Sequence, residues 1–352
     1  MKKTMKRIAS LTLALAMALT LAACGNASSS NGSAGSSGSS SGAGSESTGS
    51  AGSDFPNQTI TLICPYAAGG GTDVILRALC DSASKIAGVN IIVENITGGN
   101  GATGVVTMMD AAPDGYTIGS CSGEWVSLKE MGLAPEGFDY NNAELIMHYN
   151  FDPACYLVST DSPYQSIEDI VNAAMADPGN VTLGVTAAGG AHHLASLLFQ
   201  DRCGAEFNIV PYSEGSSATV TALMSNQVDI ACVTTAEATA QIKAGQVRVL
   251  GICSEERLDS YPDVPTLKEC GYDVVYGSWR GLAAPKGTPT EVVDKLEDIF
   301  YQAAQTQEFI DFCTSNNNEI DLLNKEEFAQ RFVDQEALIK DVCQIYAQLQ
   351  NS

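Results

Sequence analysis

Basic residues are scarce in this 352-residue sequence, which has 18 Lys and Arg against 41 Asp and Glu. Four of the basic residues fall within the first seven positions, and without them 14 face the same 41, a net charge of −27. Nucleic-acid binding needs a basic surface, so this composition argues against it. The field of the whole protein would also repel an anionic ligand, whose binding would need a local site of oriented backbone N–H groups.

Long apolar runs are also few. The stretch from Ile8 to Leu21 follows the basic start and is short for a permanent membrane-spanning helix, and no later run is long enough. It ends in Leu21-Ala22-Ala23-Cys24, which resembles the lipobox of bacterial lipoproteins. We therefore predict a signal peptide at 1–23 and a lipid on Cys24 that anchors an extracytoplasmic protein to the cell membrane. The alternative is an ordinary signal peptide with a cysteine nearby.

Large side chains are almost absent from the next segment, residues 24–53, which consists mainly of Ser, Gly, Ala and Asn. Such a composition buries too little apolar surface to fold, so this segment is predicted to be a flexible tether behind the anchor. The first residues suited to a packed structure are Phe55 and Pro56. About three hundred residues remain, enough for one large or two medium domains.

The chain has 11 cysteines, but their spacing matches no common pattern of metal ligands. Ten of them lie beyond Cys24, none in a CxxC pair, and most stand in apolar stretches such as Ala231-Cys232-Val233. We expect mostly free thiols that act as small hydrophobic residues, and one or two disulfides stay open because exported proteins commonly form them. The pair His192-His193 predicts no metal site, because adjacent helical residues face different directions.

Strand and helix patterns alternate along the remaining chain. Strands are predicted at 60–64, 89–94, 116–121, 144–149, 154–159, 181–185, 207–210, 230–234 and 247–253. Helices are predicted at 74–86, from the loop 98–104 to Ala112, and at 166–176, 191–201, 217–225, 237–244, 291–313 and 325–349. Alternation of this kind predicts an α/β fold with parallel strands.

Two glycine-rich loops join a strand to a helix, at Pro65–Asp73 and at Gly184–His193. Open α/β sheets bind ligands beyond the carboxyl ends of their strands, where loops and helix N-termini meet. The backbone N–H groups at a helix start attract anions, and Thr72 or Asp73 is placed to cap the first helix. Both loops therefore predict anion binding, although each is also explained as a tight turn.

Two motifs that would indicate other functions are weak. The run Gly99–Gly104 matches GxGxxG, with Glu124 about twenty residues later, but it follows the second strand, so a loop near the ligand cleft is the better interpretation. Gly215-Ser216 and His193 supply hydrolase residue types, but the GxSxG elbow is missing. We expect neither catalysis nor a cofactor.

Several ordered motifs resemble one known family, the extracytoplasmic receptors of tripartite tricarboxylate transporters, also called Bug receptors. The motifs are 63–73, Val93-Glu94-Asn95, Pro113-Asp114-Gly115-Tyr116-Thr117, Val210-Pro211-Tyr212, Gln227-Val228-Asp229, 261–266 and 279–285, and the similarity extends over 54–350. The resemblance implies an α/β, two-lobed periplasmic-binding-protein type II (Venus flytrap) fold with the ligand in the cleft. One lobe would comprise 54–154 and 254–352, the other 155–253, with crossings near Cys155 and Cys253.

The family's function would be capture of a small organic carboxylate by a monomeric receptor that delivers it to membrane permease subunits. A binding module that reports the ligand to a sensor, and an extracellular hydrolase, are the alternatives. In the family, backbone groups of the two glycine-rich loops hold a carboxylate, partly through water. The residues carried over to this chain are Ala67, Ala68, Gly70, Gly71, Thr72 and Asp73 in the first loop, and Thr186, Ala187, Gly189, Gly190 and His193 in the second.

This sequence departs from the family at two places. Gly190 stands where the family often has Ser, so a hydroxyl donor is missing. The segment Ser122–Trp125 is also unusual, and if Glu124 faces the cleft it would repel a second carboxylate and favour an amine or a hydroxyl.

Three further residues are candidates for the cleft. Trp279 and Arg280 belong to one of the family-like motifs, and Arg280 is placed either to pair with a ligand carboxylate or to close a structural salt bridge. Glu237 follows a predicted strand and either lines the cleft or caps a helix.

Overall fold

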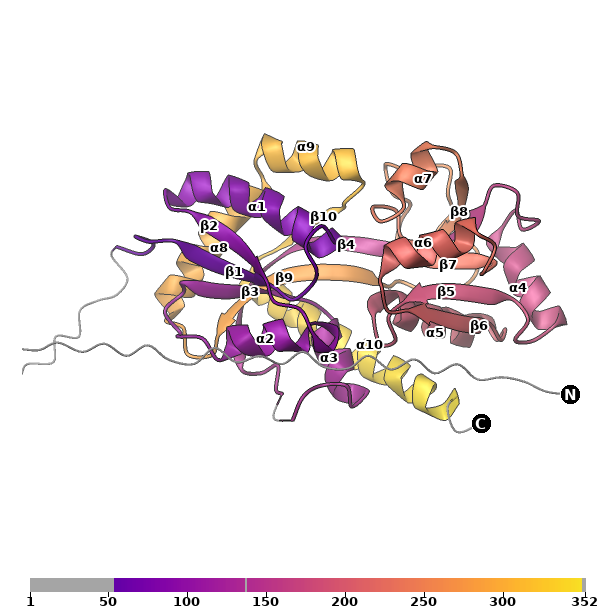
Figure 1. The fold of residues 1–352 in the computed structure, drawn as a ribbon, viewed down its shortest axis with the longest axis horizontal. Coiled ribbons are helices and arrows are strands. Elements are labelled where there is room, and N and C mark those ends of the chain that lie inside the picture. The colour runs from indigo at the N-terminus through magenta and orange to yellow at the C-terminus, as the bar shows by residue number, and fades with distance from the viewer. Residues whose placement is uncertain (1–53, 137, 350–352) are drawn as a thin grey trace, which may run out of the picture. The chain divides into compact units, whose positions relative to one another are not determined.

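A ten-stranded sheet organises the part of the chain that the structure, a computed structural model, describes, residues 54–136 and 138–349 (Figure 1). The strands are β1 (Ile60–Cys64), β2 (Ile91–Asn95), β3 (Thr117–Cys121), β4 (Ala143–Ser159), β5 (Thr182–Thr186), β6 (Asn208–Tyr212), β7 (Ile230–Thr234), β8 (Val247–Ile252), β9 (Gly277–Pro285) and β10 (Ile320–Leu323). The predicted signal peptide 1–23, the lipid on Cys24 and the tether 24–53 lie outside these residues.

The described residues form ten helices, nine between strands and the last, α10, after β10. They are α1 (Gly71–Ala87), α2 (Ala102–Met109), α3 (Glu124–Glu130), α4 (Ile167–Ala176), α5 (Ala191–Cys203), α6 (Ser216–Met224), α7 (Thr239–Lys243), α8 (Thr290–Ala304), α9 (Gln307–Asn316) and α10 (Lys325–Leu349), with a 3-10 turn η1 (Gly99–Gly101) before α2. None of the helices in the described residues is long and apolar enough to cross a membrane.

The sheet has two parallel ends and an antiparallel middle. β1 pairs in parallel with β2 and β3 at one end, and β5 pairs in parallel with β6 and β7 at the other. Between them β4 and β9 are antiparallel to each other and run across the middle of the sheet (Figure 1). The prediction of parallel strands is therefore correct for the ends and wrong for the middle. Strand β9 was not predicted because it is buried on both faces and has no alternating pattern.

Strand β4 joins the two ends of the sheet. Its first part pairs with β9 and β10, and its last part with β7 and β8, so the two strands predicted at 144–149 and 154–159 are one. The polar residues between the two predicted strands suggested a boundary that the structure does not have. Asn150 and Asp152 are buried there and hydrogen-bonded to each other at 2.9 Å. This is the expected α/β, two-lobed fold. The lobe boundaries stay a prediction, and they fall within β4 at Cys155 and directly after β8 at Cys253.

The apolar face of α8 packs into the core. In α8 the buried residues Val292, Leu296, Ile299, Phe300 and Ala303 recur at helical spacing. The long helix predicted at 291–313 is in fact two, because Thr306 leaves the helical conformation and caps α9 by accepting the Phe309 N–H.

All ten cysteines of the described residues have free thiols, and nine are buried.

Candidate functional site

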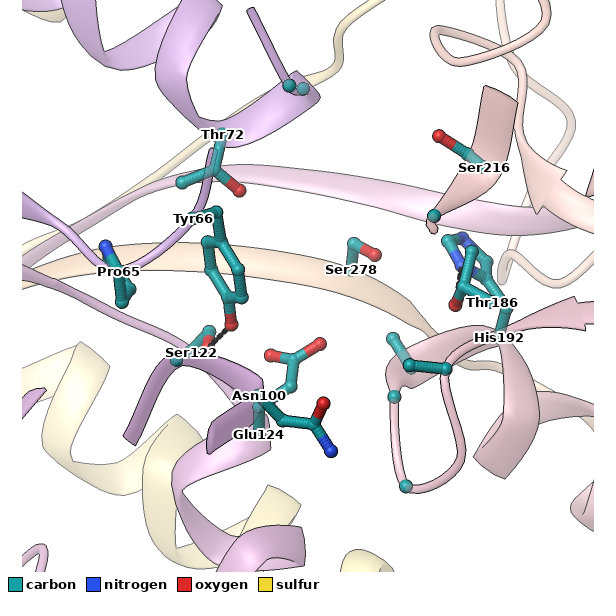
Figure 2. A pocket seen from close by; sticks show the side chains of 18 of the residues that line it. Pro65, Tyr66, Thr72, Asn100, Ser122, Glu124, Thr186, His192, Ser216 and Ser278 are labelled. Carbon is teal, nitrogen blue, oxygen red and sulfur yellow. Dashed lines mark hydrogen bonds between the residues drawn. The ribbon is translucent and has the colours of Figure 1, made fainter. Parts of the chain in front are cut away.

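A pocket of about 460 Å³ lies between the two ends of the sheet, within the range of small-molecule sites. Both glycine-rich loops line it, together with η1, the start of α3, strand β9 and residues 213–217, which lead into the start of α6 (Figure 2). Of the predicted site residues, the pocket brings together Ala67, Gly70, Gly71, Thr72, Glu124, Thr186, Ala187, Gly189, Gly190, Glu237, Trp279 and Arg280. It leaves out Ala68, which is exposed, and Asp73 and His193, which are buried behind the loops.

The two glycine-rich loops have the same backbone conformation. Gly69 and Gly189 adopt φ of 78° and 80°, and the residues that follow them, Gly70 and Gly190, both have φ −74° and ψ 165°. The N–H groups of Gly70 and Gly190 donate to carbonyl groups three residues earlier, at 3.1 and 2.9 Å. The loop sequences align residue for residue at an offset of 120 positions.

Each loop places the start of a helix at the pocket. Neither α1 nor α5 has a side-chain cap, and the first N–H groups of a helix have no partner within it. Gly71 and Thr72 open α1 at one wall, and Ala191 and His192 open α5 at another. Two helix N-termini, each with partial positive charge, thus line one pocket, which is suited to an anion.

Each loop is held from behind by a side chain four residues later. Asp73 Oδ2 accepts the Gly69 N–H at 2.8 Å, and His193 Nδ1 accepts the Gly189 N–H at 3.1 Å. Asp73 also binds Arg77 and Asn95. The two residues fix the loop shape instead of lining the pocket, so their predicted place in the ligand site is wrong.

His193 acts as an acceptor only while it is neutral. Burial lowers its pKa to about 4, and the ring of Tyr346 from α10 packs edge-on against it at 5.2 Å. Near neutral pH the imidazole is therefore uncharged, with its proton on Nε2 and Nδ1 free to accept from the loop.

Arg280 joins the first loop to the middle of the sheet. Its Nη1 donates to Asp152 Oδ2 at 2.7 Å and to Asn150, and its Nε donates to Thr72 Oγ1 at 3.0 Å. Burial acts to lower the pKa of Arg280, but the charge of Asp152 and other nearby groups raises it above its ordinary value. The structural salt bridge is therefore present. The remaining nitrogen, Nη2, lies 3.5 Å from where a Cβ on Gly71 would stand.

Glu237 and His192 form a second polar wall. Glu237 Oε2 accepts the Thr234 N–H at 3.0 Å and lies 3.4 Å from His192 Nε2, while His192 Nδ1 is 3.0 Å from Thr186 Oγ1. Glu237 therefore both caps the turn before α7 and lines the pocket. His192 is the histidine that lines the pocket, and the offset of the two loops, which pairs it with Thr72, is the signal by which the sequence could have shown this.

Glu124 is the first residue of α3, and its carboxylate points into the pocket (Figure 2). The Tyr66 hydroxyl and Ser122 Oγ, 3.4 Å apart, lie on the same side. Trp279 also lines the pocket, but most of its ring is buried against Phe328 and Phe332.

Sequence reasoning missed part of the lining. Tyr66 lies within the first glycine-rich loop and Ser122 in the unusual segment 122–125, but neither was named as a site residue. Ser278 and most of residues 213–217, which also line the pocket, were likewise not named as site residues. The expectation that Gly99–Gly104 lies near the cleft is confirmed, because Asn100 and Gly101 line the pocket. No group of His, Cys, Asp and Glu within residues 54–136 and 138–349 is arranged to hold a metal ion.

Comparison with known proteins gives a consistent result. The model of the family described as tripartite tricarboxylate transporter family receptor matches residues 75–346. A UPF0065 protein from the gbd 5' region of Cupriavidus necator is 33% identical over 279 residues, 78% of this chain and 84% of that protein. Protein BugT of Bordetella pertussis is 30% identical over 261 residues, 73% and 79% of the two chains.

Two solved structures extend the comparison. A TctC solute-binding protein from Polaromonas has a TM-score of 0.70 at 31% identity, covering 82% of this chain and 98% of that one. MatC from Rhodopseudomonas palustris, solved with bound malate, has a TM-score of 0.71 at 25% identity, covering 82% and 100%.

The buried His193 should make stability depend on pH. Its pKa is about 4 in the folded protein and about 6.5 when unfolded, so the unfolded chain takes up the proton first as pH falls. Titration of this histidine should therefore lower the free energy of unfolding by about 3 kcal/mol between pH 6.5 and pH 4. Denaturation of the wild type and of His193→Gln, which does not titrate, should show the wild-type advantage shrinking as pH falls. A constant difference would contradict this account.

Proposed function

The chain belongs to the tripartite tricarboxylate transporter family of receptors, and from this premise we propose that it is an extracytoplasmic protein that captures a small organic carboxylate. The observation that carries the proposal is the pair of matching loops, which bring two helix N-termini to one pocket. MatC, a relative with the same fold, was solved with malate bound.

The proposed grip is built from backbone. The ligand carboxylate accepts N–H groups from the first turns of α1 and α5, and both helix dipoles favour its negative charge. Thr72 Oγ1 already accepts a hydrogen bond from Arg280, so its own proton is available to the ligand. These local donors allow an anion to bind although the protein as a whole is strongly acidic.

We further propose that the receptor is anchored through Cys24, stands off the membrane on the tether 24–53, and delivers its ligand as a monomer to membrane permease subunits. The short apolar run, the cysteine at its end and the Ser/Gly-rich segment support this. A sensor module would use the same pocket, and family membership favours transport. For a hydrolase, Ser216 lines the pocket, but His193 is buried behind the second loop and bonded to Gly189.

Carboxylate binding should stabilise the folded protein. A ligand at about one hundred times its Kd adds about 2.7 kcal/mol, and for about 300 folded residues Tm should rise by about 4 °C. We expect such a rise with at least one member of a panel of mono-, di- and tricarboxylates that includes amino and hydroxy acids. The corresponding amides are the controls. Native mass spectrometry of the purified protein would reveal a retained ligand, and a flat response to the whole panel would refute carboxylate binding.

A side chain at Gly71 should obstruct the site. A Cβ there would stand 3.5 Å from Arg280 Nη2, so the fold accommodates it while it fills the mouth of the first loop. Gly71→Val should weaken binding of the panel ligand at least tenfold by calorimetry. Ala68→Val places the same side chain on the exposed part of the same loop and should change affinity less than about twofold. Equal effects of the two substitutions would remove the first loop from the site.

The anchor can be tested on the full-length protein expressed in a bacterium that lipidates exported proteins. The wild type should fractionate with membranes, resist a high-salt wash and incorporate labelled fatty acid. Cys24→Ser should abolish the label and release the protein, whereas Ser28→Ala, in the same segment, should behave as the wild type. An unlabelled wild type would favour an ordinary signal peptide.

A further inference from the structure

Three acidic side chains line the pocket, which is unexpected for a site that binds a ligand with several negative charges. Glu124, Glu214 and Glu237 all line it, while Arg280 supplies the lining guanidinium and no lysine joins it among the described residues. Arg280 is already neutralised by buried Asp152. Apart from the backbone N–H groups of the helix starts, the side chains that line the pocket therefore have an excess of negative charge.

The three glutamates are not equivalent. Glu237 accepts a backbone N–H and lies beside His192, and Glu214 is exposed at the rim. The side chain of Glu124 is partly buried, and its carboxylate makes no hydrogen bond or ion pair with residues 54–136 and 138–349. It points into the space between Tyr66 and His192 (Figure 2).

The position of Glu124 at the start of α3 does not explain why its carboxylate lacks a hydrogen-bonding partner. An acidic residue in the first turn of a helix is stabilised by the helix dipole, but α3 has no side-chain cap and the carboxylate bonds none of its N–H groups. The Oγ of Ser127 instead bonds the Gly189 carbonyl at 2.8 Å, which fixes α3 against the second loop. The second loop thus holds the helix that places Glu124 at the pocket.

A second unsatisfied group lies on the opposite wall. His192 is 3% exposed, and its Nε2 makes no hydrogen bond in the described part of the chain, although Glu237 is 3.4 Å away. A buried polar atom without a partner is costly, and a polar ligand in the pocket would satisfy it.

From these contacts we propose that the ligand carries a cationic nitrogen as well as its carboxylate, and that Glu124 is the specificity-determining residue that binds this nitrogen. The inference rests on the proposed carboxylate grip. A second ligand carboxylate would meet the like charge of Glu124 in a partly desolvated site, whereas an ammonium group would form a charge-assisted hydrogen bond with it. The negative field of the protein, which repels a dicarboxylate, favours a net-neutral zwitterion.

Matched ligands test this selection on the wild type. Short ω-amino and α-amino carboxylates are compared by calorimetry with alkyl carboxylates and dicarboxylates of equal chain length, such as 4-aminobutanoate, pentanoate and glutarate. An amino carboxylate should bind at least tenfold more tightly than both of its partners. Tighter binding of a dicarboxylate would overturn the inference and leave the carboxylate receptor intact. Absence of binding by every carboxylate would overturn both.

Glu124→Gln keeps the shape of the side chain and removes its charge. It should weaken binding of the amino carboxylate at least tenfold, change that of the alkyl carboxylate less than about threefold, and strengthen that of the dicarboxylate. Glu130→Gln, the same substitution at the exposed end of the same helix, should leave all three affinities unchanged. An unchanged ratio of amino to alkyl carboxylate affinity in Glu124→Gln would overturn the assignment, and circular dichroism checks that each variant is folded.

Discussion

The buried ion pair between Asp152 and Arg280 is the interaction on which the centre of the structure depends. Asp152 accepts four hydrogen bonds, from Asn150 and the Glu319 N–H on one oxygen and from Arg280 and Asn318 on the other. A carboxylate can be buried so deeply only when its oxygens are satisfied in this way. The pair fastens β4 to β9 where both strands cross between the two ends of the sheet, and through Thr72 it also positions the first loop.

The pairing of Arg280 with Asp152 limits which groups of the pocket can bind an anion. Among the described residues no lysine lines the pocket, and its buried arginine is already committed to Asp152. What remains for anion binding is the backbone, presented twice in the same conformation by loops that Asp73 and His193 hold from behind. In the binding mode proposed above, the carboxylate grip depends on backbone conformation, and the charged side chains of the pocket contribute to selection.

Local signals in the sequence predicted what depends on local structure. Both strand–loop–helix units and the end of α1 at Gly88, in the left-handed conformation, are correct because glycines and apolar spacing fix them within a few residues. The antiparallel crossing was missed because β9 is uniformly buried and because the polar middle of β4 is satisfied by residues far along the chain. The assignment of Asp73 and His193 to the pocket failed for a similar reason. Whether a side chain at a helix start points into the pocket or behind the loop depends on the conformation of the loop that precedes it.

The duplicated loop has a consequence for release. Since each loop supplies only one wall of the site, a bound ligand is shared between two ends of the sheet, and neither end alone holds a complete set of donors. Moving the ends apart would separate the two sets of donors without breaking a covalent bond or changing a charge. If the ligand is delivered as proposed, a membrane partner would release it by moving the two ends of the sheet apart.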